Sequence, residues 1–287
     1  MNRKIKKLLT ASVIGMLVFK NAYYTQPIDN PIVTFSKDDN VAIGLCYHRI
    51  TDNDLYNEFL KFAVHPDELV KYSVDEKHFE ENIKFLLDSK CKFLTLDEFI
   101  KCKENGTFPK NAVFLSFDDA DETLYKNAFP ILKKYNVPFT VFVIASQVGN
   151  VFCNMKMCTW DQLNEMKNSG LASFGSHTFD MHYTDDKAIF LKNNQVNDFK
   201  EDIIKSKKVI DENLNINIET IAYPFGEPND EIANATEEAG FKYGFILAPN
   251  VIDSKKDDNY WINRYEIDQE NFYTIMNQWN DLQNQIC

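Results

Sequence analysis

Apolar runs and helical apolar spacings alternate along the chain from residue 41 onwards. The run at residues 41–46 (VAIGLC) predicts a buried strand, and Phe79, Ile83 and Leu86 recur at helical spacing within residues 76–89. Similar patterns predict further extended segments at residues 92–96, 111–117, 138–144, 172–176, 219–223 and 243–247. They predict further helices at residues 97–103, 122–135 with a break near Pro130, 161–169, 195–213, 230–239 and 271–285. The chain is therefore expected to be built from repeated βα units.

Repeated βα units imply parallel strands joined by right-handed crossovers. Seven or so strands are too many for a small open sheet, so we expect an α/β fold with a single irregular (β/α) barrel of about seven parallel strands, which can be incomplete. With 287 residues and 44% hydrophobic positions, the chain can bury one large core. We therefore expect one domain over residues 41–287.

The first residues have the order of an export signal. Basic residues at 1–7 (MNRKIKK) precede an apolar run at 8–19 (LLTASVIGMLVF), which is shorter than the ~20 residues that span a bilayer as a helix. Lys20 occupies a position where a cleavage site has a small residue. Residues 1–24 are thus expected to be a signal peptide or an uncleaved membrane tether, followed by a linker at 25–40. Either reading predicts a secreted or extracellular, surface-associated protein.

Charge and cysteine content narrow the classes of partner. A formal charge of −12 and a pI near 4.9 argue against nucleic acid, whose phosphates require a basic face. We expect a monomer.

The chain has 6 cysteines, of which Cys153 and Cys158 are the nearest pair in sequence, and export would allow oxidation. The spacing fixes no disulfide pairing.

The segment at residues 55–64 (LYNEFLKFAV) is apolar and aromatic for a connection between elements. Such a patch often marks contact with a membrane surface or a ligand. A helix buried on the barrel is an equally good interpretation of this segment.

The predicted strand ends carry the polar residues with catalytic potential. In a parallel α/β fold, functional side chains gather where strands end, and four strand ends qualify here. Asp118 and Asp119 follow one apolar strand, and two adjacent carboxylates repel each other unless a cation stabilises one of them. His177 and His182 follow another strand and could add two neutral imidazoles. Two histidines and one carboxylate leave positions open for water and substrate, as catalytic metal sites do.

Each of these features has an ordinary structural explanation. Paired aspartates after a strand are often a helix cap with a solvated neighbour, and two histidines are more often surface or core residues than ligands. Their joint occurrence at strand ends of one βα fold favours the metal site.

At this point a family resemblance is clear. The sequence Ser116-Phe117-Asp118-Asp119 resembles the first motif of the polysaccharide deacetylase superfamily, which shares the NodB homology domain. The segment from Ser176-His177-Thr178 to His182 and the sequence Tyr223-Pro224-Phe225-Gly226 resemble its second and third motifs. The resemblance implies that Asp119, His177 and His182 bind one divalent metal ion and that Asp118 is the general base.

The resemblance also implies two supporting roles. The backbone N–H of Phe225 would stabilise the oxyanion of the reaction. Arg264, within Trp261-Ile262-Asn263-Arg264, resembles the arginine that holds the base carboxylate, although an ordinary surface arginine is the alternative.

Within the superfamily, the chain is most similar to the intercellular-adhesin branch of poly-β-1,6-N-acetyl-D-glucosamine N-deacetylases, which act in biofilm synthesis. Stretches such as residues 92–96, 118–123, 130–135 and 221–224 carry this similarity. Ala120 replaces the usual glycine, the spacing of the two histidines is one residue longer than the common form, and Ala222 stands where an arginine is frequent. A late histidine motif is missing from the sequence. Since this branch places the acid histidine early, the resemblance implies that His48 is the general acid.

The expected function is therefore hydrolytic removal of N-acetyl groups from a polysaccharide of N-acetylglucosamine. The metal chemistry leaves other polymers open as substrates, namely peptidoglycan, chitin oligomers and acetylated xylan. A non-catalytic glycan-binding domain is a third possibility, but it predicts damage to the metal set or the base, and all four residues are present. Zn²⁺ is expected from availability, while Co²⁺, Ni²⁺ and Fe²⁺ suit the same donors.

Overall fold

The computed structural model describes residues 40–52, 72–153, 155–182, 195–226 and 228–285. The expected signal or tether, the linker up to residue 39 and the apolar segment 55–64 lie outside these residues. Among the helices described, none has the length and apolar character needed to traverse a lipid bilayer.

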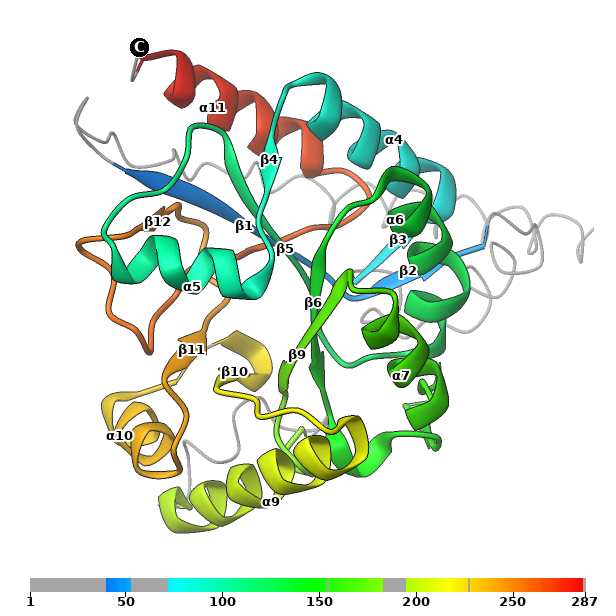
Figure 1. The fold of residues 1–287 in the computed structure, drawn as a ribbon, viewed down its shortest axis with the longest axis vertical. Helices are drawn as coiled ribbons and strands as arrows, with labels where there is room; N and C mark the ends of the chain where they lie inside the picture. The colour runs from blue at the N-terminus through cyan, green and yellow to red at the C-terminus, as the bar shows by residue number, and fades with distance from the viewer. Residues whose placement is uncertain (1–39, 53–71, 154, 183–194, 227, 286–287) are drawn as a thin grey trace, which may run out of the picture. The chain divides into compact units, whose positions relative to one another are not determined.

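A mostly parallel sheet forms the centre of the fold (Figure 1). The longest of the described strands, β1 (Val41–Tyr47), pairs in parallel from Ala42 to Tyr47 with the whole of β5 (Ala112–Phe117). From β5 the sheet continues in parallel through β6 (Phe139–Val143), β9 (Ala172–Ser176), β10 (Thr220–Ala222) and β11 (Tyr243–Phe245). Short strands complete it: β4 (Lys92–Phe93) beside β5, and β12 (Ile252–Asp253, antiparallel) and β13 (Tyr265–Glu266, parallel) beside β1.

Residues 262–266 connect the two ends of this sheet. Ile262 forms a parallel bridge with Phe245 of β11, and the Ile246 N–H donates to the Ile262 carbonyl at 2.8 Å. Three residues later, Tyr265 pairs with Leu45 of β1. The sheet thus curls into an irregular barrel, and the predicted fold class is confirmed.

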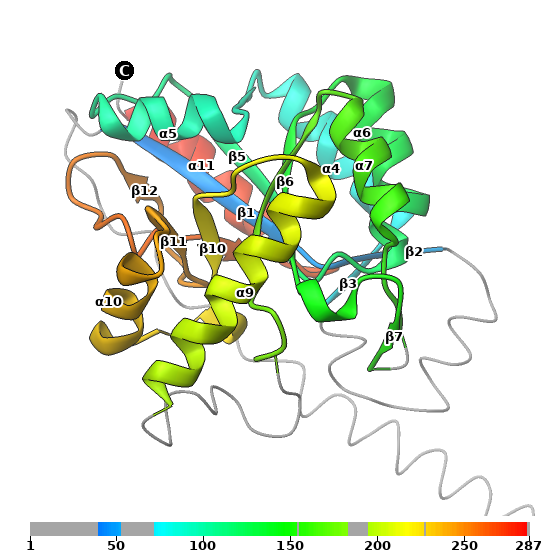
Figure 2. The ribbon, with the colours of Figure 1, turned by 60° about the horizontal axis from the view of Figure 1, so that its bottom comes forward.

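Helices pack against the curled sheet (Figure 2), and among them α9 contacts β9. They are α4 (Glu76–Asp88), α5 (Leu96–Glu104), α6 (Phe129–Tyr135), α7 (Trp160–Asn168), α9 (Val196–Leu214), α10 (Asp230–Glu238) and α11 (Phe272–Gln285). Capping boxes begin α5 at Thr95 and α7 at Thr159, where a threonine hydroxyl and a Glu or Gln side chain satisfy free backbone N–H groups. The predicted helix positions are therefore largely confirmed.

The predicted helix at 122–135 is divided. A π-helical turn, η1 (Leu124–Ala128), precedes α6, and Pro130 lies in the first turn of α6. Proline lacks a backbone N–H and is tolerated in a first turn, where that group has no helical partner. The break expected near Pro130 thus falls just before it.

Several very short elements were not predicted. β2 (Arg49–Thr51) pairs in parallel with β3 (Ser73–Asp75), and β7 (Val151–Phe152) forms a hairpin with β8 (Met155–Lys156). Two short 3₁₀ turns, η2 (Ala145–Gln147) and η3 (Pro224–Gly226), follow β6 and β10. Segments of two or three residues are too short to carry a recognisable periodicity.

The barrel interior has its own aromatic core, because alternate residues of each strand point inward. Phe114 of β5, Phe245 of β11 and Phe99 of α5 are in contact, with ring centroids 4.6 Å apart for Phe99 and Phe114 and 5.1 Å apart for Phe114 and Phe245. Phe142 of β6 lies 5.2 Å from Phe245. The guanidinium carbon of Arg264 lies 5.0 Å from the Phe142 ring centroid, so this cation rests on the aromatic core.

Gly44 of β1 provides the space for Arg264. A Cβ atom at Gly44 would lie 2.7 Å from the Asn263 carbonyl oxygen and 3.1 Å from Cγ of Arg264. Asn263 and Arg264 can therefore approach β1 this closely because residue 44 has no side chain.

The substitution Gly44→Ala should force the closing strand away from β1. We expect unfolding in urea to show a loss of about 1–3 kcal/mol, the usual cost of overpacking a core. Gly240→Ala is the control, since its added methyl group meets nothing within 4 Å and carries only the cost of a φ of 87°. If Gly44→Ala lost no more stability than Gly240→Ala, the close-packing explanation would be wrong.

Candidate active site

The structure brings the predicted site residues to one edge of the barrel. His48 follows β1, Asp118 and Asp119 follow β5, and His177 follows β9. Arg264 enters the same region from the closing strand. These positions follow from the parallel topology, since the strands all end at this edge.

Asp118 forms a bidentate ion pair with Arg264. Nη1 and Nη2 of Arg264 donate to the two carboxylate oxygens of Asp118 at 2.7 and 2.9 Å. Nη1 also donates to Oγ of Ser116 at 3.0 Å, and the exposed fractions of the Arg264 and Asp118 side chains are 0% and 1%. The alternative of a surface arginine is therefore excluded by its burial.

The ion pair sets the protonation state of Asp118. Burial raises the pKa of this carboxyl, but the charge and hydrogen bonds of Arg264 outweigh burial and hold the pKa well below its ordinary value. Asp118 is thus ionised near neutral pH, and its geometry is fixed by two parallel hydrogen bonds.

Asp119 faces the two imidazoles instead of the arginine. Its Oδ1 lies 3.6 Å from Nε2 of His177 and 3.4 Å from Nε2 of His182, distances too long for good hydrogen bonds. This oxygen is buried and has no hydrogen-bond partner among the described residues. A buried carboxylate oxygen without a donor carries a large desolvation cost unless a cation lies beside it.

Both imidazoles can present a lone pair to the space beside Asp119. Nδ1 of His177 lies 2.8 Å from the Ala222 carbonyl oxygen, which can only accept, so Nδ1 carries a proton and Nε2 is the ring nitrogen that faces Asp119. Burial lowers the pKa of His182 to about 4, so this ring is neutral near pH 7. Neutral histidine is the form that binds metal ions.

The three donors fit one small cation. Two ligands about 2.1 Å from a tetrahedral ion are about 3.4 Å apart, close to the separations between Asp119 and the two histidines. A second group of donors, Cys46, His48 and Asp118, also has ligand atoms within 4.8 Å of one another. It is unsuited to a cation because Arg264 occupies both oxygens of Asp118 and donates to Cys46 Sγ at 3.4 Å. The donor set of Asp119, His177 and His182 is therefore the candidate metal centre.

His48 lies close to Asp118. One of its ring nitrogens is within 4.8 Å of an Asp118 oxygen, and its ring centroid is 5.0 Å from that of Tyr72. Burial lowers the pKa of His48, whereas the charges of Asp119 and Asp118 raise it by less. His48 is thus a titratable group next to a fixed carboxylate.

The backbone around the site is strained at several non-glycine residues. Asp119, Ala120, Thr178 and Phe225 have φ values of 69°, 65°, 72° and 61°. Such left-handed conformations cost about 1–2 kcal/mol for residues with a Cβ atom, and they occur where surrounding contacts enforce them. In Phe225 this conformation accompanies a ring contact with His182, with centroids 5.1 Å apart.

Sequence reasoning missed several residues around the site. Cys46 lies next to Arg264, and the inward alternation of Ala42, Gly44 and Cys46 along β1 would have indicated its position. Phe152 of β7 contacts the His182 ring at 5.9 Å between centroids, which a two-residue strand does not reveal. An ion pair between Nε of Arg49 and Oδ2 of Asp121, 3.4 Å apart, joins the segment after His48 to the segment after Asp119.

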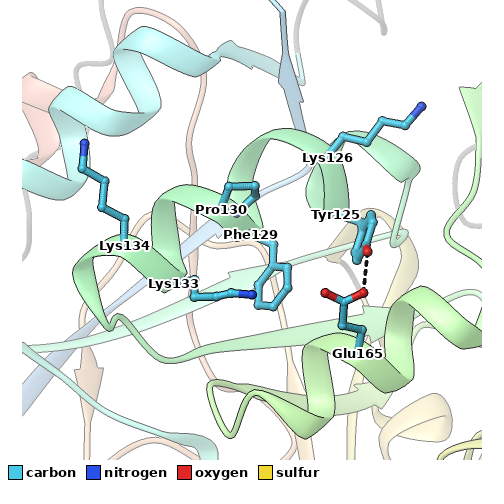
Figure 3. Close-up of a pocket in the computed structure, with 7 residues that line it drawn as sticks. All are labelled: Tyr125, Lys126, Phe129, Pro130, Lys133, Lys134 and Glu165. Atoms are coloured by element: carbon cyan, nitrogen blue, oxygen red, sulfur yellow. Dashed lines mark hydrogen bonds between the residues drawn. The ribbon is translucent and has the colours of Figure 1, made fainter.

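A separate surface cavity of about 610 Å³ lies between η1, α6 and α7 (Figure 3). Its lysines are largely neutralised, since Lys126 pairs with Glu122 and Lys134 pairs with Glu80, each at 2.7 Å. The cavity contains none of the predicted site residues. It is lined by Tyr125, Lys126, Phe129, Pro130, Lys133, Lys134 and Glu165.

Comparisons with known proteins identify a family whose matched region contains most of these site residues. The profile of the polysaccharide deacetylase family matches residues 105–244, which include both aspartates and both histidines. The solved structure of IcaB from Ammonifex degensii aligns with a TM-score of 0.72 and 27% sequence identity, covering 85% of this chain and 97% of that one.

Sequence relatives extend the match over nearly the whole chain. A poly-β-1,6-N-acetyl-D-glucosamine N-deacetylase of Staphylococcus epidermidis is 36% identical over 282 residues, covering 95% of this chain and 96% of the relative. The protein of the same name from Staphylococcus aureus strain MRSA252 is 39% identical over 254 residues, covering 88% of this chain and 87% of the relative. The chain therefore belongs to the polysaccharide deacetylase family, together with these poly-β-1,6-N-acetyl-D-glucosamine N-deacetylases.

Proposed function

We propose that this protein is a metal-dependent hydrolase that removes N-acetyl groups from poly-β-1,6-N-acetyl-D-glucosamine. The observation that carries the proposal is the opposite surroundings of the two neighbouring aspartates. Asp118 is paired with Arg264, while Asp119 faces two imidazoles and has a buried oxygen without a hydrogen-bond donor among the described residues. One carboxylate is thus suited to accept a proton and the other to hold a cation.

Amide hydrolysis requires an activated water, a polarised carbonyl and a protonated leaving nitrogen. A divalent ion held by Asp119, His177 and His182 would act as a Lewis acid that polarises the acetyl carbonyl and acidifies water. Zn²⁺ is the proposed ion, and the same donors accept Co²⁺, Ni²⁺ or Fe²⁺. Asp118 would take the proton from the attacking water, since it is ionised and held in place by Arg264.

Two further groups would complete the reaction. The backbone N–H of Phe225 would donate a hydrogen bond to the oxyanion, a role that needs backbone geometry and not a particular side chain. His48 would donate a proton to the departing amine. The proximity of His48 to Asp118 supports this assignment, because base and acid must flank the same scissile bond.

The names of the relatives, and the extent of their sequence matches to this chain, support poly-β-1,6-N-acetyl-D-glucosamine as the substrate. Both staphylococcal proteins are named for poly-β-1,6-N-acetyl-D-glucosamine, and each match covers more than four fifths of both chains. Such a substrate is extracellular, so we propose that residues 1–24 export the chain or tether it to the membrane. Association with the membrane surface or cell wall and a monomeric state are part of the same proposal.

The first test is acetate release from purified poly-β-1,6-N-acetylglucosamine, compared with peptidoglycan, chitin oligomers and acetylated xylan. We expect the first polymer to be the best substrate by kcat/KM. Asp118→Asn should reduce kcat by about 10²–10⁴-fold, the usual contribution of a general base, with the bound metal retained. Full activity of this variant would remove the base assignment, and preference for another polymer would replace the proposed substrate.

The acid assignment can be tested by pH dependence. A general acid must be protonated, so kcat/KM should fall as the pH rises through the pKa of His48. Because burial lowers this pKa, the fall should begin below the 6.5 of an unperturbed imidazole. His48→Gln should reduce kcat by about 10²–10⁴-fold and abolish the descending limb. His78→Gln is the control, since His78 lies on α4 and bonds to Asp75. A descending limb that persists in His48→Gln would exclude His48 as its source.

The contribution of the ion pair between Asp118 and Arg264 can be tested by measuring the free energy of unfolding. Asp118 has a lowered pKa when folded, so its pairing stabilises the protein above the unfolded pKa of about 3.9, and this contribution is lost as the pH falls. Arg264→Met leaves burial unopposed, which raises the pKa of Asp118 and should cost about 3–5 kcal/mol in urea unfolding at pH 7.

This cost should shrink on acidification, because protonation removes the lone buried charge. The double variant Arg264→Met with Asp118→Asn should recover much of the lost stability at pH 7. A double variant that is no more stable than Arg264→Met would show that packing of the arginine, and not its charge, matters.

A further inference from the structure

The segment between the two candidate metal ligands is a loop of four residues. Strand β9 ends at Ser176, His177 follows it directly, and the loop consists of residues 178–181, which lead to His182. Thr178 in this loop has a φ of 72°, a rare conformation for a β-branched residue. The relative positions of the two imidazoles therefore depend on contacts that hold the loop in an unfavourable conformation.

One side of the loop is held by α9. Oδ1 and Oδ2 of Asp202 accept hydrogen bonds from the backbone N–H groups of Phe179 and Asp180, at 2.7 and 2.9 Å. One helical turn later, Oγ of Ser206 lies 2.7 Å from Oγ of Ser176, which accepts from the Thr178 N–H at 3.0 Å. Hydrogen bonds to an ionised carboxylate are stronger than those between neutral groups, so Asp202 is the main anchor on this side.

The other side is held by η2. The backbone N–H groups of Ala145 and Ser146 donate to the Thr178 and Phe179 carbonyls, at 3.1 and 2.9 Å. Oγ of Ser146 also donates to Oδ1 of Asp180 at 2.7 Å. The loop is thus clamped between η2 and α9, with Asp202 as the charged element of the clamp.

The two imidazoles differ in how they are oriented. Nδ1 of His177 donates to the Ala222 carbonyl, which fixes the ring directly. Nδ1 of His182 is buried and has no hydrogen-bond partner among the residues that the structure describes. The His182 ring is placed by ring contacts with Phe152 and Phe225 and by the backbone of its loop.

We infer that Asp202 is a positioning residue of the metal centre, which places His182 by fixing the loop that carries it. This inference rests on the proposed metal site of Asp119, His177 and His182. For His177, a carbonyl outside the loop performs the orienting role that polar partners of metal-bound histidines usually have. For His182, the carboxylate of Asp202 acts two and three residues away through the loop backbone.

The test measures Zn²⁺ binding of the chelator-stripped full-length protein by competition with a chromophoric chelator. Asp202→Ala should weaken Zn²⁺ binding about 10- to 100-fold, the usual effect of losing an outer partner of a metal ligand. Asp202→Asn retains one acceptor oxygen and should have a smaller effect. At saturating Zn²⁺, kcat of both variants should approach the wild-type value, because Asp202 is not proposed to touch the substrate.

Asp211 on the same helix offers a matched control. It is also half-buried, and its Oδ1 accepts a hydrogen bond from the Ile218 N–H at 2.7 Å, in a different loop. Asp211→Ala should therefore lower the urea midpoint as Asp202→Ala does, while Zn²⁺ affinity remains at the wild-type value. Equal Zn²⁺ affinities in the two alanine variants would overturn the inference, as would a kcat of Asp202→Ala that excess Zn²⁺ fails to restore.

Should Asp202→Ala fail to fold, Asp202→Asn and Ser206→Ala serve in its place, and wild-type Zn²⁺ affinity in both would overturn the inference. The proposed function fails separately. Wild-type protein that binds Zn²⁺ but releases no acetate would refute the proposed reaction, and the comparison of Zn²⁺ affinities would still decide the role of Asp202. Wild-type protein that binds no Zn²⁺ would overturn both.

Discussion

A carboxylate buried inside a barrel is tolerated only if a cation accompanies it, and Arg264 is that cation for Asp118. Both oxygens of Asp118 receive a hydrogen bond from the guanidinium group, which itself rests on the aromatic rings inside the barrel. Its approach to β1 is possible because Gly44 has no side chain. The fold and the site thus share this interaction: the same residue fills the barrel and keeps the carboxylate of the proposed base ionised.

The adjacent aspartates show how neighbours in sequence acquire different chemistry. Asp118 continues the inward direction of β5 toward Arg264, whereas Asp119 turns away with a φ of 69° and faces the imidazoles. The arginine neutralises the first carboxylate, whereas no arginine or lysine of the described residues forms an ion pair with the second, which faces the two imidazoles. Separation of the two environments, more than the presence of two carboxylates, is what supports a base beside a metal centre.

The parallel barrel and the gathering of the site residues could be predicted from the sequence. Both follow from the order of apolar strands and helices and from the polar residues at the strand ends. Apolar strands ended by Asp118, His177 and His48 identify the edge where a parallel sheet collects its polar groups. The roles of Arg264 and Phe225 came from the family resemblance, not from any periodicity. Their burial and backbone conformation are properties of the folded chain.

Other features could not be predicted because they depend on tertiary contacts. Asp202 lies on the polar part of a long helix and resembles any solvated acidic residue until the loop after β9 is seen against it. The bridge between Phe245 and Ile262 joins a strand to a segment without a strand pattern of its own. The π-helical turn before Pro130 likewise reflects packing of η1 that local propensity does not encode.

The closing strand has a consequence for when activity can arise during biosynthesis. Arg264 and Asp118 are 146 residues apart in sequence, so their pairing requires closure of a long loop. A nascent chain that has emerged only as far as β11 already contains both aspartates and both histidines, yet it lacks the guanidinium that holds Asp118 in place. Under the proposed mechanism, competence for catalysis therefore belongs to the completed barrel.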